Sequence, residues 1–227
     1  MKYVSIDIET SGLDPEKNDI LSIAAIIEDT ENKLPFLELP KFNAIVLQNE
    51  ITGSPRAIGM NASIIDTMGR YLEADIKTKS AIELAQTGIY GGGYKFYTID
   101  EVAKEFYHFL EENGYGDGFN TQNLIEIKDG KHRPMINGNT KPITINVAGK
   151  NFGTFDKLFL QQLPWWQKLI RIRQRVLDPA ILCVDWKQDE SLPSLSQCKT
   201  KLGLDAFVTH NALDDAWDVI EILRKFY

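Results

Sequence analysis

The stretch that decides the fold is YVSIDIET, at residues 3–10. Its aliphatic residues alternate with polar ones, and this period of two predicts a β-strand that carries Asp7 and Glu9 on one face. Two carboxylates on one face can bind one Mg²⁺ or Mn²⁺ ion, because these hard cations prefer oxygen ligands. An edge strand with a solvated acidic face would show the same pattern. We expect a central strand, where two acids are costly unless they are paired or metal-bound, and this favours a metal.

A further acid, Asp156, ends the stretch ITINVAGKNFGTFD at residues 143–156. The alternation over 143–148 predicts a strand and 149–153 a turn. Thr154 is then the expected N-cap of a long helix over 157–177, kinked at Pro164. Asp156 therefore falls in the first helical turn. The helix dipole favours an acid there without any metal, so the position alone leaves both interpretations open.

The stretch HNALDDAW at residues 210–217 opens an apolar stripe, which predicts a helix from about 211 to 224 capped by Asn211. Residues five positions apart in a helix differ by about 140° around its axis. His210 and Asp215 can therefore share a site only if His210 lies in the loop before the helix, as the cap predicts. A loop histidine without a function is the alternative. We expect Asp214 to face solvent and Asp215 to bind metal.

Together these patterns resemble the DEDDh family of 3′→5′ exonucleases, which includes polymerase proofreading subunits, oligoribonuclease and ribonuclease T. The family motifs correspond here to Asp7 and Glu9, to Asp156, and to His210 with Asp215 in the His-x4-Asp form. A tyrosine-type relative would carry a tyrosine where this chain has Asn211. The resemblance covers nearly the whole chain, from about residue 4 to residue 222.

The resemblance implies an α/β fold in which a ribonuclease-H-like mixed β-sheet is flanked by helices, in a single domain over 1–227. Strands at 3–9, 19–28 and 41–48 would form its opening antiparallel meander. Insertions at about 69–97 and 114–142 would lengthen the family core. We expect 73–97 to be a mobile loop. We expect 114–142 to leave the core as a hairpin that turns at Asp129-Gly130, beside the active site or as a partner surface.

The resemblance also implies metal-dependent hydrolysis of the 3′-terminal phosphodiester of single-stranded DNA or RNA, which releases nucleoside 5′-monophosphates. Two Mg²⁺ or Mn²⁺ ions would be held by Asp7, as the bridging ligand, and by Glu9, Asp156 and Asp215. His210 would be the general base. The substrate-binding residues would be Thr10, Leu13, Asn151, Phe152 and Phe155. Leu13 would wedge against the terminal base and the aromatic rings would stack on bases, although Phe155 is equally compatible with core packing.

Two other functions fit parts of this pattern. A ribonuclease-H-like endonuclease also uses clustered carboxylates, but it does not require a histidine five positions before the last of them. An inactive nucleic-acid-binding module on the same fold is the second alternative, and the presence of all five chemical groups argues against it. A homodimer, or a polymerase or other replication partner, is compatible with the resemblance, but no separate motif points to either.

The composition bounds the remaining classes of protein. A formal net charge of −7 argues against a chain that binds nucleic acid by bulk electrostatic attraction. No apolar stretch approaches the length of a membrane span, and we expect no signal peptide, because the first predicted strand follows Met1 directly. Cys183 and Cys198 lie in apolar contexts, so we expect two buried free thiols, which favour a reducing cytoplasm.

The other segments are interpreted from periodicity and caps. We expect helices over 58–72, over 98–113 with a capping box at its start, and from Leu195 to a stop at Gly203, together with a short strand over 181–184. Basic residues recur along the long predicted helix at Lys168, Arg171, Arg173 and Arg175. They form either a solvated helix face or a track for phosphates.

Overall fold

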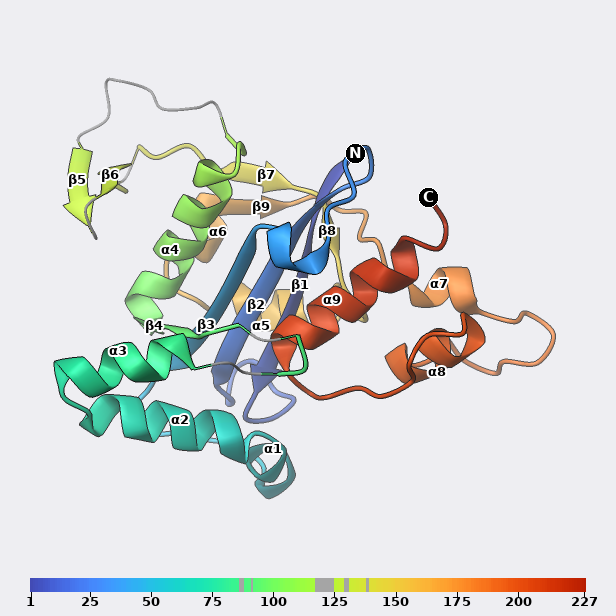
Figure 1. Ribbon diagram of the computed structural model, residues 1–227, viewed down its shortest axis with the longest axis horizontal. Coiled ribbons are helices and arrows are strands. Elements are labelled where there is room, and N and C mark those ends of the chain that lie inside the picture. Colours follow the sequence, from blue (N-terminus) through green and yellow to red (C-terminus); the bar gives the residue numbers. More distant parts are fainter. Residues whose placement is uncertain (86–87, 91, 117–124, 129–130, 138) are drawn as a thin grey trace.

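A mixed five-stranded sheet forms the centre of the chain in the computed structural model (Figure 1). The structure describes residues 1–85, 88–90, 92–116, 125–128, 131–137 and 139–227. The strand order in the sheet is β4-β3-β2-β1-β8. The strands are β1 (Lys2–Thr10), β2 (Ile20–Asp29), β3 (Lys41–Leu47), β4 (Lys95–Thr98) and β8 (Val147–Ala148).

β1, β2 and β3 form the antiparallel meander that the sequence predicts. β4 joins β3 in parallel and β8 joins β1 in parallel, so the sheet is mixed, as expected. β1 is paired on both sides and therefore has the interior position expected for it. Its register against β2 shifts between Glu9 and Thr10, so the regular ladder ends just after the two acids.

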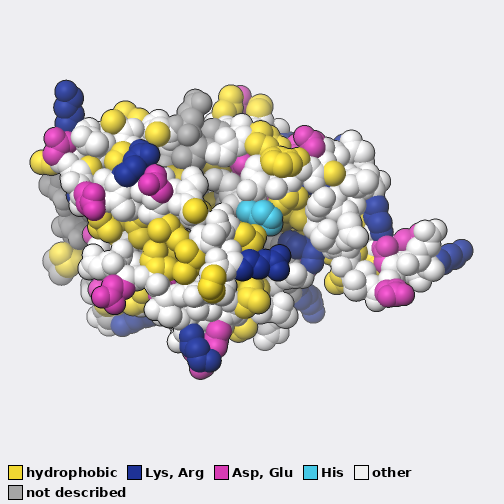
Figure 2. All heavy atoms as spheres, turned by 90° about the horizontal axis from the view of Figure 1, so that it is seen from below, with side chains coloured by type: hydrophobic (Ala, Val, Ile, Leu, Met, Phe, Trp, Pro, Cys, Tyr) yellow, Lys and Arg dark blue, Asp and Glu magenta, His cyan; other side chains and the backbone are white. Residues whose placement is uncertain are grey.

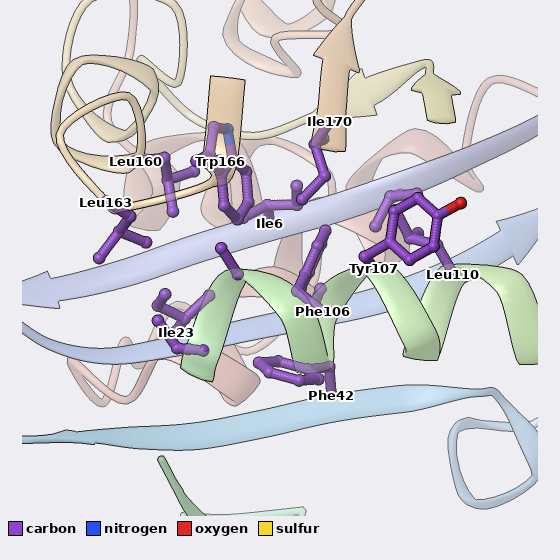
Figure 3. Packing of buried hydrophobic residues seen from close by; sticks show 14 of the residues in the cluster. Ile6, Ile23, Phe42, Phe106, Tyr107, Leu110, Leu160, Leu163, Trp166 and Ile170 are labelled. Carbon is purple, nitrogen blue, oxygen red and sulfur yellow. The ribbon is translucent and has the colours of Figure 1, made fainter. Parts of the chain in front are cut away.

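Helices cover both faces of this sheet. One face packs against α4 (Ile99–Glu112), α5 (Asp156–Leu160) and α6 (Trp166–Leu169). Figure 3 shows Phe106 and Trp166 packed over Ile6, Ile23 and Phe42 of the strands. The other face packs against α9 (Ala212–Leu223). Because side chains alternate along a strand, the aliphatic face of β1 enters the first cluster and its acidic face turns toward α9.

The predicted helix starts are confirmed where a cap accompanies an apolar stripe. α4 begins with the expected capping box, α8 (Leu195–Lys201) with another, and α9 with the Asn211 cap. The helix predicted over 58–72 is divided into α1 (Pro55–Met60) and α2 (Ala62–Glu73). A 3-10 turn at Phe36–Glu38 precedes β3. Cys183 and Cys198 are buried free thiols, as predicted.

Within the described ranges, every helix is too short or too polar to cross a membrane.

The prediction of a mobile loop over 73–97 is wrong for the part of it that the structure describes. α3 (Ile76–Leu84) is capped by Asp75, whose Oδ1 accepts from the Thr78 amide at 2.8 Å. The segment then enters the central sheet as β4 and forms one of its edges. Of the residues of α3, only Ile82 is buried, so the helix has no apolar stripe that periodicity could reveal.

The long helix predicted over 157–177 is also wrong. Pro164 lacks the amide hydrogen that a continuous helix needs, and Trp165 has a left-handed backbone with φ of 70°. The chain forms α5, then α6, and then β9 (Ile170–Ile172), which pairs in parallel with β7 (Ile143–Ile145). β7 and β8 thus divide the strand expected over 143–148. The four basic residues of this segment do not share one helix face.

The short strand expected over 181–184 is instead a helix, α7 (Ala180–Cys183). Asp178 accepts from the Ala180 amide at 2.9 Å and opens the helix. A run of four apolar residues is too short for periodicity to distinguish a strand from a buried helical turn, and this explains why the predicted strand is wrong.

The hairpin expected within 114–142 is confirmed by the antiparallel pairing of β5 (Ile125–Lys128) with β6 (Lys131–Pro134). Its expected turn, Asp129-Gly130, lies outside the described residues. In Figure 1 the hairpin lies beside the C-terminal half of α4, apart from the central sheet. Its expected place beside the active site or at a partner surface stays a prediction.

We predict that Arg224→Met lowers the free energy of unfolding by about 3–5 kcal/mol, because it leaves a buried carboxylate without its cation. Arg224 binds both carboxylate oxygens of the fully buried Glu28, at 3.0 and 2.7 Å. Urea unfolding followed by circular dichroism measures the loss. The control is Arg70→Met, which removes an exposed pair with Asp66 and should cost less than about 1 kcal/mol. Equal losses in the two variants would contradict the structural role of the buried pair.

Candidate active site

Four acids and one histidine line a single pocket of about 420 Å³ at the end of β1. The lining residues are Asp7, Ile8, Glu9, Lys150, Asn151, Thr154, Phe155, Asp156, His210 and Asp215. The structure therefore brings together all five residues that the sequence singled out for chemistry. Figure 2 looks onto the lower side of the molecule, where a histidine side chain reaches the surface among hydrophobic and basic side chains.

Asp7, Glu9 and Asp215 form the tightest group in this pocket. One carboxylate oxygen of each lies within 4.8 Å of the other two. Asp215 lies in the first turn of α9, the helix that packs on the acidic face of β1. The buried Ser5 hydroxyl donates to the Ala216 carbonyl at 2.7 Å and fixes strand to helix next to the acids. The spacing of the three carboxylates thus depends on the packing of one helix against one strand.

Asp156 approaches these three carboxylates from the edge of β1 that pairs with β8. β8 pairs with β1 only as far as Ser5, and no described strand pairs with β1 beyond that point on this side. The Ile8 amide, which lies between the two acids of β1, therefore donates to Asp156 Oδ1 at 3.2 Å. The chain can pass this close because residue 149 is glycine: a Cβ at Gly149 would lie 2.9 Å from the Ile6 carbonyl oxygen.

His210 lies in the loop before α9, as the Asn211 cap predicts, and its side chain is exposed. Its backbone is left-handed, with φ of 54°, and Asn151 on the same pocket has φ of 56°. This conformation costs of order 1–2 kcal/mol per residue outside glycine. Strained backbone of this kind concentrates at functional sites, where the surrounding structure holds it in place.

The pKa values of the acids are raised, and burial is the largest cause for each of them. The pKa of Asp7 lies well above its usual range, because the charges of Asp156, Asp215 and Glu9 add to burial. Burial, then Asp215 and Asp156, raise the pKa of Glu9 to about 8. Burial raises the pKa of Asp156 to about 7, against backbone hydrogen bonds that lower it. Burial, then Asp218 and Asp214, raise the pKa of Asp215 to about 7.

The donor set fits divalent cations that prefer oxygen ligands. The four carboxylates offer only oxygen, as Mg²⁺ and Mn²⁺ favour. Asp215 Oδ1 is buried and accepts no hydrogen bond from any residue in the described part of the chain. A cation would satisfy this atom and would offset the cost of ionising buried, neighbouring carboxylates. Asp7, Glu9, Asp156 and Asp215 are therefore the residues that could hold such ions.

A second cavity of about 410 Å³ adjoins the first and shares Ile8, Glu9 and Phe155 with it. Thr10 and Leu13 also line this cavity, together with residues of α1 that include Arg56 and Met60. The Leu13 side chain is 83% exposed, so it projects from the rim and is free to touch a ligand. Phe155 packs on Phe159 with ring centroids 5.1 Å apart and still borders both cavities. A space of this size and lining can enclose a base and its sugar.

Phe152 does not border either cavity, contrary to its expected role as a stacking surface. Its side chain is fully buried in the cluster between the sheet and α4 to α6. A residue in the turn before a helix can point inward as easily as outward, and periodicity does not extend into the turn. The N-cap of α5 is Phe155, one residue after the expected Thr154. Thr154 Oγ1 donates instead to the Asn151 carbonyl at 3.1 Å.

The sequence analysis assigns the wrong environment to Asp214 and gives no role to Lys150. Asp214, expected to face solvent, is 2% exposed and accepts hydrogen bonds from the segment 89–90, which no local pattern connects with it. Lys150 lines the pocket that holds the four acids, and its Nζ donates to Asn151 Oδ1 at 2.6 Å. Its only signal in the sequence was its place in the glycine-rich turn before Asp156.

The fold is similar to that of solved nuclease structures. E. coli Exonuclease I in complex with a dT13 oligonucleotide matches with a TM-score of 0.54 at 14% identity, over 99% of this chain and 40% of that chain. The zinc ion bound form of the E. coli Exonuclease I complex with single-stranded DNA matches at 0.52 and 14%, over 98% and 39%. Cell-death related nuclease 4 (CRN-4) matches at 0.53 and 12%, over 99% and 63%.

These likenesses establish the fold at low sequence identity. The chain shares the fold of these nuclease structures, with the central mixed sheet flanked by helices that the sequence predicts. It spans less than half the length of the Exonuclease I chains. No protein-family model matches the sequence, and no curated protein matches it either.

We predict that the metal-free protein becomes less stable as the pH rises from about 4 to about 8. The window begins at the ordinary pKa values of the acids, 3.8 for Asp and 4.5 for Glu, and ends at their folded values, about 7 for Asp156 and Asp215 and about 8 for Glu9. A raised pKa means that the folded state keeps protons that the unfolded state releases, so a rising pH favours unfolding in this window. Melting temperatures in the presence of a chelator measure the slope.

Removing one acid should reduce this pH dependence, so the Glu9→Gln variant should show a smaller slope than the wild type. Saturating Mg²⁺ or Mn²⁺ should flatten the slope too, because a bound cation favours ionised carboxylates. Parallel curves for wild type and Glu9→Gln in chelator would show that the four acids do not repel one another in the folded protein.

Proposed function

We propose that the chain is a single exonuclease domain that hydrolyses the 3′-terminal phosphodiester of a single-stranded nucleic acid and releases nucleoside 5′-monophosphates. The observation that carries this proposal is the convergence of four carboxylates and His210 on one pocket. The exonuclease-type fold supports it, as do the oligonucleotides bound to its structural neighbour. Whether the strand is DNA or RNA depends on contacts to the 2′ position, which the assay below distinguishes.

The metal site would consist of Asp7, Glu9, Asp156 and Asp215. The chemistry that two bound Mg²⁺ or Mn²⁺ ions supply in such a site is activation of water and stabilisation of charge on the leaving 3′ oxygen. The protein also fixes the positions of these carboxylates before any ion or substrate binds. Their packing between β1, α5 and α9 keeps the donor oxygens at fixed positions, so little reorganisation is needed when a substrate binds.

His210 is the proposed general base. Its imidazole borders the same pocket as the acids, and histidine is the side chain that most often serves as a general base. A ring nitrogen would accept the proton of the attacking water and would release it to bulk solvent, to which the exposed side chain has access. His108, by contrast, is buried in α4 and lines neither cavity.

The terminal nucleotide would occupy the second cavity. Leu13 at its rim would separate the last base from the one before it, and Phe155 would form the wall shared with the metal site. Thr10 borders the second cavity and would contact the sugar, and Asn151 borders the pocket of the acids and would contact the phosphate. Lys150 is the one lysine or arginine among the described lining of this pocket, so it would face a phosphate oxygen.

We predict progressive shortening of 5′-labelled single strands from the 3′ end in Mg²⁺ or Mn²⁺, with release of mononucleotides and no cleavage in chelator. Asp7→Asn and Asp156→Asn should lower turnover by several orders of magnitude with the fold intact, because both water activation and leaving-group stabilisation are lost. His210→Ala should lower it by about 100- to 10,000-fold, the usual contribution of a general base. Labelled DNA and RNA oligonucleotides of one sequence measure the preference.

The control variant is Asp100→Asn, which removes an exposed acid at the start of α4 and should leave turnover unchanged. A circular single strand should stay intact, since it has no 3′ end. Cleavage of the circle would favour an endonuclease. Binding of the linear strand without any cleavage would favour an inactive binding module on the same fold.

A further inference from the structure

Asp214 is a buried carboxylate that the proposed metal site does not use. It precedes Asp215 in the first turn of α9, and its side chain is 2% exposed. Its oxygens accept from the Ile89 amide at 2.8 Å, the Tyr90 amide at 3.5 Å and the Thr209 hydroxyl at 3.0 Å. The neighbouring Asp215 keeps one oxygen without a hydrogen bond from the described residues, whereas Asp214 is occupied by protein donors. Asp214 is therefore bound by the protein itself, whereas Asp215 keeps an oxygen available for a ligand.

The backbone of Gly88 to Tyr90 wraps around the Asp214 carboxylate. Gly88 has φ of +69°, and a Cβ at this position would lie 2.7 Å from both carboxylate oxygens. Any other residue would be strained and would push the carboxylate away. We call Asp214, Thr209 and the backbone of Gly88 to Tyr90 the Asp214 clasp.

The clasp is attached to α9 by the Tyr90 side chain as well. The Tyr90 ring lies 6.2 Å from the Trp217 ring in an edge-on arrangement, and its hydroxyl donates to Glu221 at 3.3 Å. The Phe36 ring packs against both aromatic rings. The segment that holds Asp214 is thus fixed to the same helix that carries Asp215.

The clasp ends at the residue before His210. Thr209 is held by Asp214, while on the other side Asn211 caps α9 and donates to the Tyr94 hydroxyl at 3.0 Å. No described residue forms a hydrogen bond with the His210 imidazole, so the position of the ring depends on its backbone. That backbone is left-handed and would relax toward ordinary angles if its neighbours were released.

We propose that Asp214 is a positioning residue for His210, which it acts on through Thr209 and the clasp. The inference rests on the proposed function of His210 as general base. In this proposal the segment 88–90 holds the loop that carries His210 in place. The sequence suggested that this segment belongs to an insertion. A shift of about 1 Å in a reacting group can lower a rate about 100-fold, so a clasp without direct substrate contact matters for catalysis.

The test compares Thr209→Val and Asp214→Asn with two matched controls. Thr209→Ser keeps the hydroxyl, and Ile89→Ala keeps the amide while it trims a side chain that is 57% exposed. Thr209→Val and Asp214→Asn should lower kcat on a single-stranded oligonucleotide by up to about 100-fold with KM and Mn²⁺ affinity unchanged. Both controls should match the wild type. Unfolding curves verify that each variant is folded. If Asp214→Asn does not fold, the comparison of Thr209→Val with Thr209→Ser decides the outcome.

A second readout does not depend on activity. The chain has three histidines, so ¹³C-histidine labelling gives few signals, and His210→Ala assigns the one of interest. This signal should shift or broaden in Thr209→Val and Asp214→Asn and stay in place in both controls. If the wild type proves inactive, the proposed function fails, but the signal still tests the clasp.

Three results would overturn the positioning role. The first is an unmoved His210 signal in Thr209→Val and Asp214→Asn. The second is an unchanged kcat in both variants of an active enzyme. The third is a loss of kcat that a weaker Mn²⁺ affinity accounts for in full, since Asp214 would then act on the metal site through Asp215.

Discussion

The burial of four carboxylates close together at the end of β1 is the constraint on which the rest of the site depends. Burial disfavours ionisation and raises the pKa of each acid, and neighbouring negative charge adds to the rise for Asp7, Glu9 and Asp215. A protein that needed only stability would separate or replace these side chains. This chain holds them together with a helix packed on one side of the strand and a turn packed on the other. Cations bound in the pocket would offset this cost at neutral pH, and this connects the electrostatics of the fold with the proposed chemistry.

The geometry of the site follows from where secondary structure stops. β8 ends at Ala148, so the Ile8 amide is left for Asp156 and does not enter a ladder. The β1–β2 register shifts directly after Glu9, and both His210 and Asn151 have left-handed backbone. Each irregularity lies at the pocket, while the interiors of the sheet and of α4 and α9 are regular. The hydrophobic clusters on the two faces of the sheet hold the strained segments in place, because loosening the packing would release all of them together.

The parts of the structure that the sequence predicts are those with strong local signals. Alternation gave β1 with its two acids, and caps with apolar stripes gave α4, α8 and α9, with His210 outside the helix. The failures lie where long-range contacts decide the structure. Nothing near Asp214 indicates that residues 89–90 will cover it, nothing in the turn at Phe152 indicates that its ring points inward, and α3 has too little buried surface to show a stripe. Pro164 lies between α5 and α6, where the periodicity predicts one continuous helix with a kink.

The central claim is that Asp7, Glu9, Asp156 and Asp215 are gathered to hold divalent cations. The most direct measurement is anomalous diffraction from crystals of the wild-type protein grown in Mn²⁺, with data collected on both sides of the manganese absorption edge. We expect two anomalous peaks in the pocket at the end of β1, in contact with oxygens of these four side chains. Absence of any peak there at saturating Mn²⁺, or peaks found only elsewhere on the molecule, would contradict the claim and would leave the clustered acids without an explanation.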